Sequence, residues 1–297
     1  MRKAWGSARL TLTLVWLLSV CSAEASISVV GSLDHHYTLA PGETFEGYIQ
    51  VNNSSDEPAI VRVELADYGV TPEGNAYYPK PNSHPRSLAK YIQMMPPEQT
   101  IAPLAQGKVG FKVTLPTLTD LPELAGAYWA VLLVRQSELA EVMTAPTLDE
   151  WVIKERFQTA VRITASVRGN GLTQLHYEGA RLVWPESKDQ TETNHPLFEV
   201  DMVNDGAHLL DLELIGELFD RTGESLGRTA LGALRIYPGH RRRVEWVLDS
   251  AQLSSHQPPT ELWLMANPRA RMIDRKRFGG RFMIKPRESA RFGNGVD

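Results

Sequence analysis

The chain has 297 residues, of which 42% are hydrophobic and 22% are charged, a balance typical of folded proteins and unlike that of disordered ones. Its 22 glycines and 19 prolines are scattered, which excludes collagen-like and low-complexity architectures. The formal net charge of −4 argues against a chain-wide nucleic-acid binder, and the length predicts two domains, each large enough to bury its own core.

The first 25 residues have the features of a secretion signal. A basic start precedes the apolar run Leu10 to Val20, which is shorter than a bilayer-spanning helix. The small residues Ala23 and Ala25 then predict cleavage before Ser26. An uncleaved membrane anchor and lipid attachment at Cys21 are the alternatives. With no later apolar span, the sequence predicts an exported protein that is not an integral membrane protein.

Alternation of apolar and polar residues with a period of two predicts β-strands in the first half of the chain. Val61 to Leu65, Val109 to Leu115 and Val161 to Val167 all show it, so each strand should have one buried and one wet side. The stretch Ala127 to Val134 is apolar at every position and predicts a central strand, covered on both faces.

The same pattern restarts after the turn-rich triplet Gly169-Asn170-Gly171, for example at Leu210 to Leu214 and Val244 to Leu248. Pro41-Gly42 and Pro238-Gly239 each precede an alternating strand and predict β-turns. The elements together predict an all-β chain with two β-sandwiches in tandem. The expected divisions are a signal peptide over 1–25, sandwiches over 26–168 and 172–286, and a basic flexible tail over 287–297.

No motif for catalysis, metal binding or a cofactor is present. The chain lacks a G-x-S-x-G elbow, an H-E-x-x-H pair and a phosphate-binding glycine loop. His35 and His36 are the only adjacent histidines, and neighbours on a strand point to opposite faces. Cys21, the single cysteine, would be removed with the signal peptide. The sequence therefore predicts a protein that is not an enzyme and that needs no metal and no cofactor.

The end of the chain is basic, whereas the rest is acidic. From Arg269 onward there are nine Lys and Arg against three Asp and Glu, and the counts from Ser26 to Pro268 are 19 and 31. A surface for an anionic partner and a basic edge hairpin that blocks unwanted strand pairing are both consistent with this charge. The candidate residues for such a surface are Arg269, Arg271, Arg275, Lys276, Arg277 and Arg281.

The segment from Arg135 to Phe157 separates two strong strands by more residues than a hairpin needs. Trp151, Ile153 and Phe157 share one strand parity, so they could insert into a partner's groove if this stretch paired with a partner's sheet. A long loop that folds back onto its own sandwich is the alternative.

These residues resemble the periplasmic pilus-chaperone superfamily (PapD-like), whose members have two immunoglobulin-like domains behind a signal peptide. The resemblance is carried by the P-G-x-x-x-x-x-x-I-x-V-x-N run of Pro41 to Asn53 and by Ala59 to Asp67, Ile92 to Pro97, Val109 to Pro116, Ala127 to Val134 and Phe157 to Ile163. The N-terminal pattern is also similar, more weakly, to the peptidoglycan-binding domain of WxL-type surface proteins.

The resemblance implies a periplasmic chaperone that assists the assembly of pilus or surface-fibre subunits by edge-strand pairing. It places Arg162 as a carboxylate anchor and Trp151, Ile153 and Phe157 on the strand donated to the subunit. A basic residue is also expected on the first strand, and Ile27 to Gly31 contains none. Partners would be the subunits and, as a further candidate, an outer-membrane export pore. The alternative function is a cell-envelope or cell-surface module that binds a wall glycan or an anionic polymer.

Overall fold

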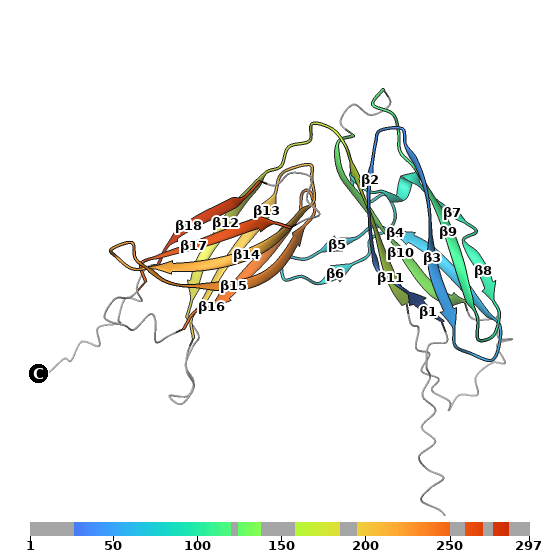
Figure 1. Ribbon diagram of the computed structural model, residues 1–297, viewed down its shortest axis with the longest axis horizontal. Coiled ribbons are helices and arrows are strands. Elements are labelled where there is room, and N and C mark those ends of the chain that lie inside the picture. Colours follow the sequence, from blue (N-terminus) through green and yellow to red (C-terminus); the bar gives the residue numbers. More distant parts are fainter. Residues whose placement is uncertain are drawn as a thin grey trace, which may run out of the picture.

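A computed structural model of the chain describes residues 27–119, 124–137, 158–184, 195–249, 259–269 and 276–284. Two immunoglobulin-like β-sandwiches follow one another along the chain (Figure 1). Among the described residues the only helical element is the single 3₁₀ turn η2, Ala89–Tyr91. The all-β class and the tandem sandwiches predicted from the alternating segments are thus confirmed.

The first sandwich consists of two sheets with the orders β1-β3-β9-β7 and β2-β11-β10-β4-β8. The strands of the first sheet are β1 (Ile27–Val30), β3 (Thr44–Asn53), β9 (Gln106–Thr114) and β7 (Ile92–Met95). Those of the second sheet are β2 (Asp34–Leu39), β11 (Gln158–Val167), β10 (Gly126–Ser137), β4 (Ala59–Ala66) and β8 (Glu98–Ile101). A small ribbon of β5 (Gly69–Val70) and β6 (Ala76–Tyr77) projects from this sandwich towards the other one (Figure 1).

The second sandwich has sheets with the orders β12-β13-β16 and β15-β14-β17-β18. The first contains β12 (Leu175–Val183), β13 (Leu197–Asn204) and β16 (Arg241–Val247). The second contains β15 (Ser225–Ile236), β14 (Leu210–Phe219), β17 (Glu261–Pro268) and β18 (Phe278–Met283).

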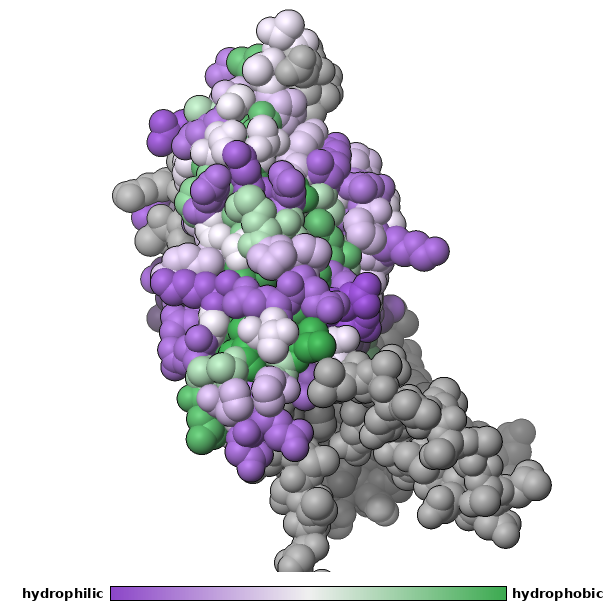
Figure 2. All heavy atoms as spheres, turned by 90° about the vertical axis from the view of Figure 1, so that its right-hand side faces the viewer, coloured by the Kyte–Doolittle hydropathy of each residue, from purple (hydrophilic) through white to green (hydrophobic). Residues whose placement is uncertain are grey.

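The core of each sandwich is built from the inward residues of its alternating strands. Val61 and Val63 on β4, and Val161 and Ile163 on β11, are buried, whereas Arg62 between the first pair is exposed. On β11 the side predicted to be wet is buried at Thr164, which is 1% exposed and stands opposite Trp129, where the second sandwich packs. Seen from its outer side, the first sandwich has broad hydrophilic areas broken by separate apolar patches (Figure 2). Because one face of this sandwich is wet, its stability comes from the layer between its sheets.

Strand β10 is the exception, since it is buried on both faces. Tyr128, Ala130 and Leu132 point into the sandwich core, and Ala127 and Trp129 point the other way into a separate apolar cluster with residues of the second sandwich. The strand lies between β11 and β4, so the predicted central position is confirmed. At Ala127 and Trp129 its second face is covered by the neighbouring sandwich.

Both predicted Pro-Gly turns are present. Gly42 and Gly239 have φ of +76° and +74°, and the backbone N–H groups of Glu43 and His240 donate to the carbonyl oxygens three residues earlier at 3.1 and 3.0 Å. The second turn brings His240 to the boundary between the sandwiches. No helix among the described residues is long and apolar enough to cross a membrane.

Candidate functional site at the contact between the sandwiches

An aromatic cluster joins the two sandwiches. Trp129 of β10 and Tyr237, which follows β15, are 1% and 2% exposed, and their ring centroids lie 4.6 Å apart. The indole N–H of Trp129 donates to the carbonyl oxygen of Tyr68 at 2.8 Å, and the ring of Tyr68 packs edge-on against Tyr237. Burial raises the pKa of Tyr237 to about 12, so its phenol is neutral at physiological pH.

Backbone hydrogen bonds hold the sandwiches at two further points. The N–H of Ala127 donates to the carbonyl of Ala207 at 2.8 Å, and the N–H of Arg243 donates to the carbonyl of Pro72 at 2.7 Å. Gly126 allows the first approach: its φ is +111°, and a Cβ there would lie 2.2 Å from the carbonyl oxygen of Ala207. The sandwiches are therefore docked through main chain as well as side chains.

Two histidines from different sandwiches meet beside Trp129. The ring centroids of His84 and His240 are 5.5 Å apart. The backbone N–H of Arg86 donates to Nδ1 of His84 at 3.1 Å, and Nδ1 of His240 lies 3.2 Å from the carbonyl oxygen of Pro238. Burial, and for His84 also the proximity of His240, lowers the pKa of both imidazoles.

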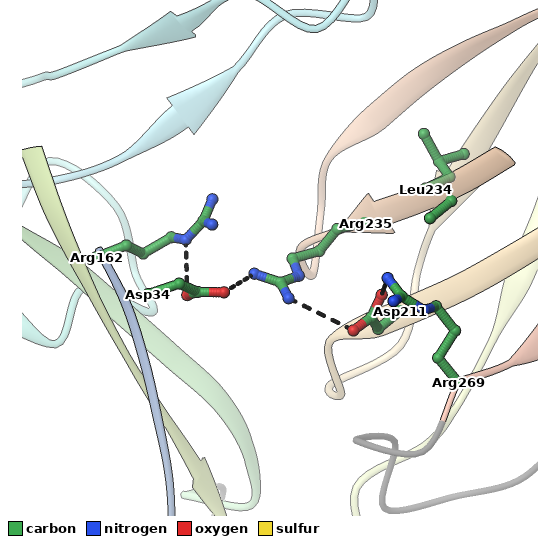
Figure 3. Close-up of a pocket in the computed structure, with 7 residues that line it drawn as sticks. Asp34, Arg162, Asp211, Leu234, Arg235 and Arg269 are labelled. Atoms are coloured by element: carbon green, nitrogen blue, oxygen red, sulfur yellow. Dashed lines mark hydrogen bonds and ion pairs between the residues drawn. The ribbon is translucent and has the colours of Figure 1, made fainter. Parts of the chain in front are cut away.

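A chain of ion pairs crosses the same boundary next to this cluster (Figure 3). Nε of Arg162, on β11, lies 3.0 Å from Oδ1 of Asp34, on β2, and the guanidinium of Arg235 on β15 pairs with the other oxygen, Oδ2. Arg235 also reaches Oδ2 of Asp211 at 3.4 Å, and Arg269 reaches Oδ1 of Asp211 at 3.4 Å. These five residues line an open pocket of about 230 Å³ between the sandwiches.

The arginines in the pocket control the ionisation of Asp34. Burial by itself would raise the pKa of this carboxyl, but the hydrogen bonds and charges of Arg235 and Arg162 outweigh it and hold the pKa below its usual value. Arg162 is further held by the hydroxyl of Tyr68, which lies 3.1 Å from its Nη1. At neutral pH the pocket therefore contains three cations and two carboxylates.

Strand β11 has an open edge beside Arg162. It pairs with β10 from Gln158 to Val167, but its parallel partner β2 covers it only from Arg162 onward. The backbone N–H of Arg162 donates to the carbonyl oxygen of Leu33, just before β2. Successive residues of a strand point their backbone N–H and C=O groups to alternate edges, so the even-numbered residues of β11 point theirs to the edge that β2 partly covers. Within the described part of the chain, the backbone groups of Gln158 and Ala160 on that side have no strand beside them.

The candidate residues predicted from the sequence are distributed as follows. Arg162 lies in the inter-sandwich pocket at the end of this open edge. Trp151, Ile153 and Phe157 lie outside the described residues, as do Arg271 and Arg275. Sequence reasoning missed Asp34, Asp211 and Arg235. No local signal separates these residues from other charged residues on strands.

Apart from Arg269, the remaining basic candidates within the described residues do not line the pocket. Arg269 follows β17 and faces Asp211, whereas Arg281 of β18 lies opposite Trp263, roughly 20 Å away along β17 at about 3.3 Å per residue. The guanidinium carbon of Arg281 is 3.7 Å from the centroid of the Trp263 ring. Lys276 and Arg277 are exposed, and the ammonium of Lys276 lies 5.7 Å from the Phe278 ring centroid.

Comparison with solved structures finds fimbrial chaperones. The chain is similar to a chaperone–tip adhesin complex of CFA/I fimbriae (TM-score 0.46, 10% identity, 88% of this chain and 100% of that one). It is also similar to the class 5 fimbriae chaperone CfaA (0.45, 11%, 88% and 99%) and to a complex of the Salmonella enterica SafA pilin with the SafB chaperone (0.39, 10%, 88% and 97%). No family model and no curated protein matches the chain.

Proposed function

We propose that this protein is an exported, non-enzymatic chaperone that binds subunits of a pilus or surface fibre in the periplasm. The observation that supports this function best is the open edge of β11, which ends at a cluster of arginines. An exposed strand edge offers unpaired N–H and C=O groups to an extended chain, and such pairing supplies main-chain hydrogen bonds.

The direction of β2 suggests how a subunit strand would lie. β2 runs parallel to β11 and begins beside Arg162, so it occupies only the second half of that edge. A subunit strand that continued the line of β2 backwards along Gln158 to Val161, parallel to β11, would reach Arg162 with its C-terminal end. Its terminal carboxylate would then meet a guanidinium, the pairing that gives bidentate recognition.

Trp151, Ile153 and Phe157 would extend this interaction. They precede β11 in the sequence and share one strand parity, so their side chains would point to the same side of a strand continued from β11. In this proposal they insert into the unfinished sandwich of the subunit while the backbone of β11 supplies the hydrogen bonds.

Substitutions at Ala160 test the open edge directly. Its N–H points to the side that β2 leaves open, and proline removes that N–H while remaining tolerable on a strand edge. The tagged chain is recovered from the periplasm of its own source, and co-purified proteins are identified by mass spectrometry. Ala160→Pro should lose the subunits that the unmodified chain captures, and Arg162→Gln should retain fewer of them.

Ala160→Val is the matched control, because it keeps the N–H and should keep every partner. Trp151→Ala and Ile153→Ala should also weaken capture. An Ala160→Pro variant that is folded, as judged by its urea midpoint, and that still captures every partner would contradict binding at this edge.

A further inference from the structure

Arg162 and Arg235 together form a site for a carboxylate beside the open edge of β11. The carboxylate of Asp34 occupies this site. One carboxylate oxygen of Asp34 contacts Arg162 and the other contacts Arg235 (Figure 3). A carboxylate from a partner would make the same two contacts. We propose that Asp34 is an internal competitor: it occupies the Arg162–Arg235 site in the free protein, and a partner's carboxylate displaces it. The inference deepens the function proposed above and rests on it only for the identity of the partner.

The charges of the pocket favour an added anion. Arg162, Arg235 and Arg269 carry three positive charges, and Asp34 and Asp211 carry two negative ones. One further carboxylate would bring the five residues to neutrality. The pocket of about 230 Å³ is several times the volume that one water takes in the liquid, about 30 Å³, so a carboxylate fits beside the arginines.

The existing ion pairs are exchangeable because water reaches them. The side chains of Arg162, Asp34 and Arg235 are 25%, 22% and 21% exposed. Ion pairs that are partly hydrated contribute little net free energy, since each partner regains water when the pair opens. A partner that brings its own carboxylate therefore has only a weak internal pair to replace.

Displacement of Asp34 would also change how the sandwiches are linked. Asp34 belongs to the first sandwich and Arg235 to the second, so their ion pair is one of the ties across the boundary. After exchange, the partner's carboxylate would bridge Arg162 and Arg235 in place of Asp34. A bound partner would then be held by both sandwiches at once, whereas the edge of β11 belongs to the first alone.

The test uses sodium acetate as the carboxylate probe and the Nε–H signal of Arg162 in ¹⁵N NMR as the readout, with sodium chloride holding the ionic strength constant. The signal is assigned by its absence from Arg162→Lys. In Asp34→Asn the half-saturating acetate concentration should fall roughly fivefold, which corresponds to the upper range for a partly exposed ion pair. Asp34→Ser serves as a second variant if the amide perturbs folding.

Asp201→Asn is the charge-matched control. It also removes one negative charge, but Asp201 pairs with Arg243 at 2.9 Å and does not line the pocket. It should leave acetate binding at Arg162 much less changed than Asp34→Asn does. Equal effects of the two variants would mean general electrostatic attraction and would overturn displacement. An unchanged or higher half-saturating concentration in both Asp34 variants would overturn it too.

A second arm separates this inference from the proposed function. The probes are the peptide acetyl-Thr-Val-Thr-Val-Thr-Val with a free C-terminal carboxylate and the same peptide as an amide. Asp34→Asn should strengthen binding of the acid but not of the amide, and Ala160→Pro should weaken binding of both peptides while leaving acetate binding intact. If acetate behaves as expected and neither peptide binds, the β11 edge function is contradicted and the competitor role of Asp34 stands.

Discussion

The contact between the sandwiches has an aromatic part and an ionic part. The two parts are adjacent but differ in their exposure to solvent. Trp129 of β10 pairs with Thr164 of β11, and Val131 pairs with Arg162. The aromatic and ionic parts are therefore only two residues apart along these strands. On the other side, Tyr237 lies two residues beyond Arg235. Trp129 and Tyr237 are 1% and 2% exposed, whereas the side chains of the Asp34–Arg235 ion pair are about one fifth exposed.

This difference assigns the two parts different roles. Removing a buried indole leaves a cavity and costs about 3–5 kcal/mol, whereas a partly exposed ion pair contributes about 0–1 kcal/mol. The aromatic part therefore makes the larger side-chain contribution to docking, beside the backbone hydrogen bonds at Ala127 and Arg243. In the proposal above, the ionic part exchanges partners without undocking the sandwiches.

Trp129→Ala should give the largest effect on docking. It removes the ring that packs on Tyr237, on His84 and on His240, and it leaves a cavity at the boundary, with an expected loss of about 3–5 kcal/mol. Urea unfolding should show a lower midpoint, and spin labels on the two sandwiches should show a broader distance distribution. Trp129→Phe, which keeps an aromatic ring, should lose much less. A Trp129→Ala variant with an unchanged distance distribution would refute the assigned role.

Acidification should give the next largest effect, through His84 and His240. The pKa values of both imidazoles are lowered in the docked state. At a pH below the ordinary imidazole pKa, which is about 6.5, the rings therefore bind protons more readily when they are separated and hydrated than when they are docked. The stability that the neutral rings contribute is present above that pH and is lost as the pH falls. The charge of Asp67 opposes this shift at His84, and the charge of Arg86 adds to it.

The measurement compares urea midpoints at pH 7.5 and pH 5.5. The unmodified chain should lose more stability than the double variant His84→Gln, His240→Gln. Asp34 stays ionised over this range because its pKa is lowered, so the ionic part does not contribute. Equal losses in both proteins would exclude the histidine pair as the cause.

Arg235→Gln should give the smallest effect on stability. Asp34 keeps Arg162 and Asp211 keeps Arg269 as partners, so no carboxylate is left without a cation. The expected loss of unfolding free energy is about 1 kcal/mol or less. High salt should reduce this loss, because salt screens the ion pairs that the substitution removes. A loss as large as that of Trp129→Ala would abolish the distinction between the two parts of the contact.

Much of the fold follows from local pattern. The alternating segments at Val61 to Leu65 and Val161 to Val167 are strands, and the wholly apolar Ala127 to Val134 lies in a central strand. The prediction of a wet side was wrong for the second half of β11, where Thr164 and Ser166 are buried as well as the apolar residues between them. The candidate site was found only in part. Arg162 was identified through a family resemblance, whereas Asp34 and Arg235 carry no local signal that separates them from other charged residues on strands.

The sequence by itself determined several of the strands and the side of each that faces its own core, because side chains on a strand alternate with a period of two. It did not determine that the second sandwich covers the other side of β10 and β11. Only the tertiary structure decided which strands are neighbours. Asp34 is 128 residues from Arg162 and 201 residues from Arg235, and their meeting depends on the parallel pairing of β2 with β11 and on the docking of two sandwiches. Sheet register and docking are long-range properties, so the pocket at the boundary could not be read from spacing along the chain.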